Sequence, residues 1–98
     1  MKFEVRLAES AEADLRDIYD YVALEASPDR ASAYVDRIMA FLSKLELFPQ
    51  RGTLHDDIRN GLRTIGFERR ISIAFVVESG TVVILRLLYA GRKLDPDG

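Results

Sequence analysis

Arginines are the residues of this sequence best suited to binding chemistry, and they gather in its C-terminal third. Residues 58–98 hold seven Lys or Arg, and six of the seven are arginines. A guanidinium group is planar and always charged, so it suits fixed contacts to carboxylates, phosphates or aromatic rings. Any one of the six could be ordinary surface charge, but the bias toward arginine indicates a binding surface. The six are Arg59, Arg63, Arg69, Arg70, Arg86 and Arg92.

Arg86 stands out because it interrupts the apolar run Ile84-Leu85-Arg86-Leu87-Leu88. Burial of an unpaired guanidinium costs on the order of several kcal/mol. Two interpretations are open. In the first, Arg86 forms a structural ion pair with a helix carboxylate such as Asp14 or Asp17. In the second, Arg86 and Arg63 share one face of a sheet and anchor an acidic partner or phosphates.

The residues that could support catalysis are few. The chain has no cysteine and a single histidine, His55, beside Asp56 and Asp57. A general base oriented by a carboxylate is conceivable there, but an exposed surface histidine is the favoured interpretation. Neither a metal-ligand spacing nor a phosphate-binding glycine loop is present. We therefore predict no catalytic residues, no metal and no cofactor.

Charge is divided unevenly along the chain. Residues 1–57 hold seven Lys or Arg against twelve Asp or Glu, a net charge of −5. Residues 58–98 hold seven against four, a net charge of +3, so the whole chain carries −2. We expect an acidic helical side and a basic sheet side. The absence of cysteine, of a long apolar span and of a signal peptide predicts a cytoplasmic protein without a membrane segment.

The hydrophobic pattern predicts the elements that position these residues. Ser10 and Ser27 are expected to cap two amphipathic helices, with Pro28 at the first position of the second helix and Pro49 ending it after Phe48. The predicted order is β-α-α-β-β-β, an α+β fold, in one domain over residues 1–98. The expected elements are a strand at 2–7, helices at 11–26 and 28–48, a polar connection at 49–61, strands at 62–67, 70–77 and 82–89, and a polar tail from 91.

The second predicted helix has an apolar stripe too wide for a single contact with a sheet. Part of it should face the first helix in a tight hairpin. The remainder is a candidate surface for a partner, and its candidate residues are Tyr34, Ile38, Phe41 and Leu45.

Several ordered segments resemble the ParE branch of the RelE/ParE superfamily, the toxins of bacterial type II toxin–antitoxin pairs. The likeness begins in the first two predicted helices and spans nearly the whole chain. It continues with Leu47-Phe48-Pro49-Gln50-Arg51-Gly52, with Gly61-Leu62-Arg63, and with the ending from Ile84 to Arg92. Each motif alone is weak, whereas the ordered set is specific. The resemblance implies a helical hairpin packed on a twisted, mainly antiparallel sheet.

The resemblance also implies partners. A ParD-type antitoxin would wrap the toxin with its C-terminal segment and bind operator DNA with its N-terminal part, so the toxin would meet DNA only indirectly. The wide stripe of the second helix is a plausible landing site for an amphipathic antitoxin helix. The partner-binding candidates, for antitoxin or target, are Arg63, Arg69, Arg70, Arg86, Tyr89 and Arg92.

Two activities divide the superfamily. RelE-like members cleave mRNA on the ribosome, whereas ParE-like members poison DNA gyrase by binding it. The connection at 49–61 has no lysine, no tyrosine follows Arg92, and the sequence pI is near 5.4. An RNA-cleaving protein is expected to be clearly basic. We therefore favour gyrase inhibition over RNA cleavage and keep a third hypothesis, a family member that binds its antitoxin but is not toxic.

Overall fold

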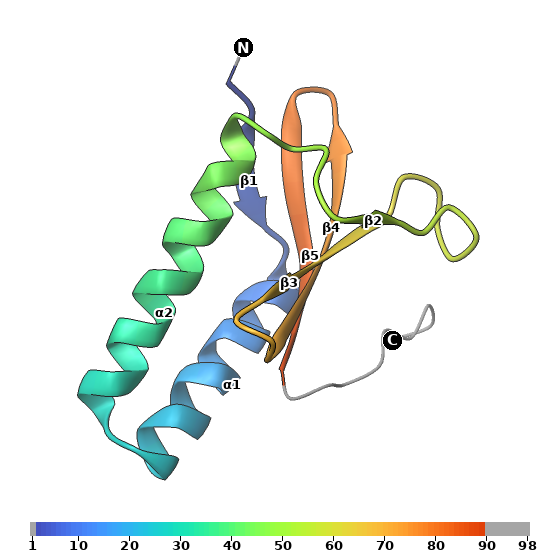
Figure 1. The fold of residues 1–98 in the computed structure, drawn as a ribbon. Coiled ribbons are helices and arrows are strands. Elements are labelled where there is room, and N and C mark those ends of the chain that lie inside the picture. The colour runs from blue at the N-terminus through green and yellow to red at the C-terminus, as the bar shows by residue number, and fades with distance from the viewer. Residues whose placement is uncertain (1, 90–98) are drawn as a thin grey trace.

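A helical hairpin covers one face of a five-stranded mixed sheet in the computed structural model, which describes residues 2–89 (Figure 1). The sheet has the strand order β1-β5-β4-β3-β2. This arrangement confirms the predicted α+β class and, apart from the short elements η1 and β2, the predicted element order. The elements are β1 (Glu4–Leu7), α1 (Glu9–Glu25), α2 (Pro28–Ser43), the short 3-10 helix η1 (Lys44–Glu46), β2 (Thr53–Leu54), β3 (Arg63–Phe67), β4 (Ile71–Glu78) and β5 (Thr81–Tyr89).

Strand β5 lies inside the sheet, which fits its almost uniformly apolar sequence. It pairs with β4 in antiparallel orientation and with β1 in parallel, so the first and last strands are neighbours. The pairs β4–β3 and β3–β2 are antiparallel. The sheet is therefore mainly antiparallel, with one parallel edge that the strand–helix–helix connection makes possible.

The short strand β2 was not predicted, because it contributes only two residues within a polar connection. It begins directly after Gly52, whose φ is +79°. A Cβ at this position would collide with the backbone carbonyl of Thr64 on β3. Only glycine tolerates both this backbone conformation and this close approach. The glycine at the end of the segment Phe48-Pro49-Gln50-Arg51-Gly52 thus has a physical reason.

The helix ends differ from the predictions at two places. Helix α1 begins at Glu9 with Ala8 at its N-cap position, so Ser10 lies inside the first turn and caps nothing. Helix α2 begins as predicted, with the Ser27 hydroxyl accepting a hydrogen bond from the Arg30 N–H at 3.1 Å. It ends at Ser43 and not at Phe48, because the chain tightens into η1 and turns Leu45 into the core.

The main core lies between the hairpin and the sheet. Consecutive residues of β4 point to opposite faces, so Ile73 and Phe75 meet the helices whereas Ala74 and Val76 face away from them. Helix α1 packs on α2 and on β5. Helix α2 reaches β3 through Tyr34 and Phe41, whose rings both contact Phe67. This packing brings the C-terminal end of α1, the N-terminal half of α2 and the β3–β4 turn to one end of the molecule.

Candidate functional site

Arg86 is joined to Asp14 in a two-pronged ion pair. Its Nε donates to Oδ2 of Asp14 at 2.7 Å and its Nη2 donates to Oδ1 at 3.1 Å. The same carboxylate accepts a hydrogen bond from the backbone N–H of Leu87 at 2.9 Å. Asp14 is only 7% exposed, whereas the Arg86 side chain is 28% exposed. These hydrogen bonds raise the pKa of Arg86 above its ordinary value.

The sheet itself explains why this carboxylate is needed. Strand β1 ends at Leu7, opposite Ile84, so within residues 2–89 no strand lies beside the edge of β5 beyond that point. The β4–β5 register shifts between the pair Phe75–Ile84 and the pair Ala74–Arg86. Such a bulge re-aims the side chains next to it. Asp14 therefore accepts the Leu87 N–H that a longer β1 would have taken, and it neutralises Arg86. The structural interpretation of Arg86, with Asp14 as partner, is confirmed.

The alternative, with Arg63 and Arg86 as a shared anchor on one sheet face, needs correction. Arg63 is opposite Phe75 on β4, and Arg86 is opposite Ala74. Adjacent residues of β4 point to opposite faces, and β4 separates the two arginine-bearing strands. Arg63 is half-buried on β3, whereas Arg86 is committed to α1. The structure does not bring the two guanidinium groups together.

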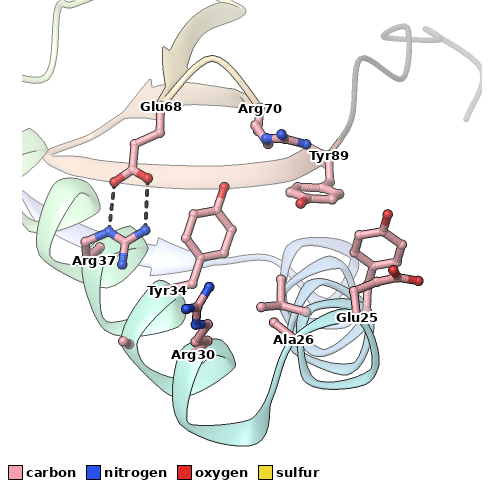
Figure 2. Close-up of a pocket in the computed structure, with 11 residues that line it drawn as sticks. Glu25, Ala26, Arg30, Tyr34, Arg37, Glu68, Arg70 and Tyr89 are labelled. Carbon is pink, nitrogen blue, oxygen red and sulfur yellow. Dashed lines mark hydrogen bonds and ion pairs between the residues drawn. The ribbon is translucent and has the colours of Figure 1, made fainter.

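An open pocket of about 650 Å³ lies where the two helices, the β3–β4 turn and the end of β5 meet (Figure 2). It brings together three residues that the sequence analysis singled out separately: Tyr34 on α2, Arg70 after the turn, and Tyr89 at the end of β5. The Tyr89 ring lies 5.5 Å from that of Tyr21 and 6.3 Å from that of Tyr34, centroid to centroid. The pocket therefore has an aromatic wall with arginine beside it.

The phenol oxygen of Tyr34 is a buried side-chain polar atom without a hydrogen-bond partner within residues 2–89. Tyr34 is 9% exposed, and its hydroxyl is buried without a hydrogen-bond partner among these residues. Figure 2 shows the hydroxyl directed between the side chains of Glu68 and Arg70. Burial raises the pKa of the Tyr34 phenol, and the nearby Tyr89 and Glu68 raise it further. The hydroxyl is thus protonated at neutral pH and available as a donor.

One wall of the pocket is held by an ion pair between Arg37 and Glu68. The Arg37 Nε and Nη2 donate to the two carboxylate oxygens of Glu68 at 2.9 Å and 3.0 Å. These hydrogen bonds lower the pKa of Glu68 and raise that of Arg37. The Arg37 guanidinium also lies over the Tyr34 ring, 5.1 Å from its centroid. The pair fixes the β3–β4 turn to helix α2.

The turn that carries Glu68 is conformationally strained. Glu68 and Arg69 have φ of 48° and 62°, in the left-handed region that L-residues avoid at a cost of roughly 1–2 kcal/mol each. The Arg70 N–H closes the turn by donating to the Phe67 carbonyl at 3.1 Å. Turns of this hand fit the twist of a β-hairpin but usually contain glycine or asparagine. Two strained non-glycine residues beside a pocket mark this turn as a candidate functional element.

The pocket residues that sequence reasoning missed include Tyr21, Arg30 and Arg37. Arg30, Tyr34 and Arg37 follow each other at helical spacing and thus lie on one face of α2. That spacing was a usable signal. Of the remaining predicted arginines, Arg69 is exposed at the turn and does not line the pocket. Arg92 lies outside the described residues.

The predicted apolar landing surface on the second helix is smaller than expected. Ile38 and Leu45 are fully buried in the core between hairpin and sheet, so neither presents surface to a partner. Tyr34 is buried except where it borders the pocket. Phe41 is half-buried, with its ring 5.1 Å from that of Phe67. The periodicity identified the apolar positions correctly, but it could not divide them between core and surface.

His55 is half-buried, contrary to the prediction of an exposed side chain. Its Nε2 is 2.7 Å from the Thr64 hydroxyl, across the β2–β3 pairing. This contact gives the histidine a structural partner. Within residues 2–89 there is no group of three His, Cys, Asp or Glu side chains placed to hold a metal ion. No helix in that range is long and apolar enough to cross a membrane.

Comparisons with known proteins agree with this architecture. The family model of the ParE toxin of type II toxin–antitoxin systems (parDE) matches residues 5–94. The chain therefore belongs to the ParE toxin family. No curated protein sequence matches it significantly.

Solved structures with a similar fold come from three bacteria. A chain of the chromosomal ParDE toxin–antitoxin system of P. aeruginosa is 27% identical, with a TM-score of 0.79, and the match covers 91% of this chain and 97% of that one. A chain of the RelBE2 toxin–antitoxin complex of Mycobacterium tuberculosis is 20% identical, with a TM-score of 0.66, over 94% and 95% of the two chains. A conserved hypothetical protein of Helicobacter pylori is 19% identical, with a TM-score of 0.51, over 89% and 93%. The last two likenesses concern the fold alone.

Proposed function

We propose that this ParE-family toxin arrests bacterial growth by binding and poisoning DNA gyrase, and that a ParD-type antitoxin neutralises it in the cytoplasm. The observation that carries the proposal is the family match over residues 5–94, supported by the similarity to a toxin–antitoxin chain of P. aeruginosa. The toxin meets operator DNA only through its antitoxin. No small-molecule substrate is required.

The environment of Arg86 favours binding over RNA cleavage. An mRNA endonuclease needs free cationic groups to stabilise the charge that develops on phosphate. Here the guanidinium of Arg86 is neutralised by buried Asp14, and His55 is engaged by Thr64. The net charge of −2 also opposes binding to a polyanion such as mRNA. These observations make a ribosome-dependent nuclease the weaker candidate.

The first test is controlled expression in bacteria, with and without the antitoxin gene. We expect growth arrest by the toxin alone and full recovery when the antitoxin is co-expressed. Ile38→Asp is the matched control, because a charge at a fully buried position destroys the fold and should abolish arrest. Unimpaired growth with soluble wild-type toxin would leave only the third hypothesis, a non-toxic antitoxin-binding protein.

The second test separates the two toxic activities. Purified toxin is added to gyrase in a supercoiling assay, and we expect loss of supercoiling with accumulation of cleaved DNA. Antitoxin added in equal amount should restore supercoiling. Codon-positioned cuts in mRNA on translating ribosomes, with gyrase unaffected, would replace this proposal with the RelE-like one.

A further inference from the structure

We propose that the pocket around Tyr34 receives a single carboxylate side chain from the antitoxin, which accepts a hydrogen bond from the Tyr34 hydroxyl and pairs with Arg70. This inference rests on the proposed function, because it takes the antitoxin as the resident partner. It assigns a binding chemistry to a pocket whose polar groups are not all paired within residues 2–89.

The first support is the Tyr34 hydroxyl. A buried hydroxyl without a partner costs about 1–3 kcal/mol, so proteins rarely retain one that never finds an acceptor. The phenol remains protonated at neutral pH, since burial raises its pKa, and its O–H has no acceptor within residues 2–89. A group that enters the pocket and carries an acceptor would satisfy this O–H. The hydroxyl points into the space beside Arg70 in Figure 2, where that acceptor would lie.

The second support is the charge balance of the pocket wall. Arg37 is neutralised by Glu68, whereas neither Arg30 nor Arg70 forms an ion pair within residues 2–89. Glu25 also borders the pocket. Three arginines and two glutamates leave one net positive charge, which suits one carboxylate. A phosphate dianion or a polyanionic chain would bring more negative charge than this single net positive charge can balance.

The third support is the surface next to the pocket. Tyr21 is 51% exposed at its rim and Leu24, on the same helix α1, is 87% exposed. A peptide lying over this end of the hairpin could cover both side chains while one acidic residue enters the pocket. Exposed apolar side chains beside an incompletely satisfied polar pocket fit a protein partner better than a free ion.

The test measures dissociation of the purified toxin–antitoxin complex for two pocket variants. We expect Arg70→Gln to accelerate dissociation about tenfold, because it removes a charge-assisted contact, and Tyr34→Phe about fivefold. Arg6→Gln, an exposed arginine on β1, and Tyr19→Phe, a tyrosine outside the pocket, are the matched controls. Each control should change the rate less than twofold. Circular dichroism checks that every variant is folded.

The outcomes separate this inference from the function on which it rests. If wild-type toxin does not bind the antitoxin, the proposed function fails. If the antitoxin binds and both pocket variants dissociate like wild type, the pocket inference alone is overturned.

A second experiment identifies the chemical group. Each Asp and Glu of the antitoxin is replaced by Asn or Gln and combined with Arg70→Gln in a double-mutant cycle. We expect one antitoxin position to be strongly non-additive with Arg70→Gln, and additivity at every position overturns the carboxylate. Titration of free toxin labelled at tyrosine should show acetate, more than inorganic phosphate, shifting the Tyr34 resonances. A stronger response to phosphate would assign the pocket to a different class of anion.

Discussion

Two polar regions of this protein contain similar residues but differ in whether their hydrogen-bonding groups have partners. At the junction of α1 and β5, Asp14 accepts three hydrogen bonds, two from Arg86 and one from the Leu87 N–H. At the pocket end, the Tyr34 hydroxyl is buried with no acceptor within residues 2–89. The junction is closed by contacts within residues 2–89, whereas the Tyr34 hydroxyl has no partner in that range, and we propose that the antitoxin supplies one. Arginine content alone cannot separate the two, but the accounting of hydrogen-bond partners can.

The comparison predicts that the junction is worth more to stability than to binding. Asp14→Ala removes three hydrogen bonds and leaves Arg86 beside the edge of β5 without a partner. We expect a loss of about 3 kcal/mol in the free energy of unfolding, measured in urea. Asp17→Ala, on the exposed face of the same helix, should change it by less than about 0.5 kcal/mol. A nearly neutral Asp14→Ala would show that the junction is not a structural element.

The second prediction contrasts Arg86 with Arg63. Arg86→Ala should cost about 2–3 kcal/mol in unfolding free energy, because it leaves the Asp14 carboxylate buried with a single backbone donor. Arg63→Ala should cost less than about 1 kcal/mol. Toxicity lost only in Arg86→Ala, in step with a lower melting temperature, marks that arginine as structural. Toxicity lost in a fully folded Arg63→Ala would place Arg63 in the target contact.

Tyr34→Phe should change the free energy of unfolding in the opposite direction. Removal of a buried hydroxyl that has no partner should stabilise the free toxin by about 1 kcal/mol, while weakening the antitoxin complex. Thermal unfolding of free toxin and of the complex measures both effects. Tyr19→Phe is the matched control. A destabilised free Tyr34→Phe would show that the hydroxyl is already satisfied, and the contrast between the two regions would disappear.

The smallest effect is expected at the Arg37–Glu68 pair, which is largely exposed to solvent. Arg37 lowers the pKa of Glu68 from its ordinary 4.5, so the pair stabilises the folded state above that pH. The contribution is lost as pH falls through the depressed pKa. Glu68→Gln should therefore be slightly less stable than wild type at pH 7 and equal to it under strongly acidic conditions. If the difference in stability between Glu68→Gln and wild type did not depend on pH, the ion pair would not be its cause. The strained β3–β4 turn would then be the remaining explanation.

The elements of the fold were readable from sequence because each has a local signature. Ser27-Pro28 begins α2, and the apolar run 82–89 defines the interior strand β5. Strand β2 was not predicted because a strand of two residues is too short to show an alternating hydrophobic pattern. The length of α2 was overestimated because apolar spacing continues through η1, where the backbone already tightens.

The site was less predictable, for a physical reason. The partner of Arg86 could be narrowed to helix carboxylates, since a buried cation needs one. The pocket, in contrast, depends on how the β3–β4 turn meets α2, which no local pattern encodes. Arg30, Tyr34 and Arg37 share a helical face and could have been grouped. That Tyr34 would lack an acceptor becomes visible only when Glu68, Arg70 and Tyr89 are placed around it.

The parallel pairing of β1 with β5 has a consequence for synthesis of the chain. Strand β1 can pair only after β5, the last strand within residues 2–89, has been synthesised, and Arg86 follows Asp14 by 72 positions. Such long-range contacts slow folding and delay it until late in translation. A nascent chain of which only the helical hairpin has been synthesised lacks Arg86 and Tyr89, so neither the junction nor the pocket can form. Both come into existence together when residues 81–89 leave the ribosome, which makes the last strand the step that commits the toxin to its folded form.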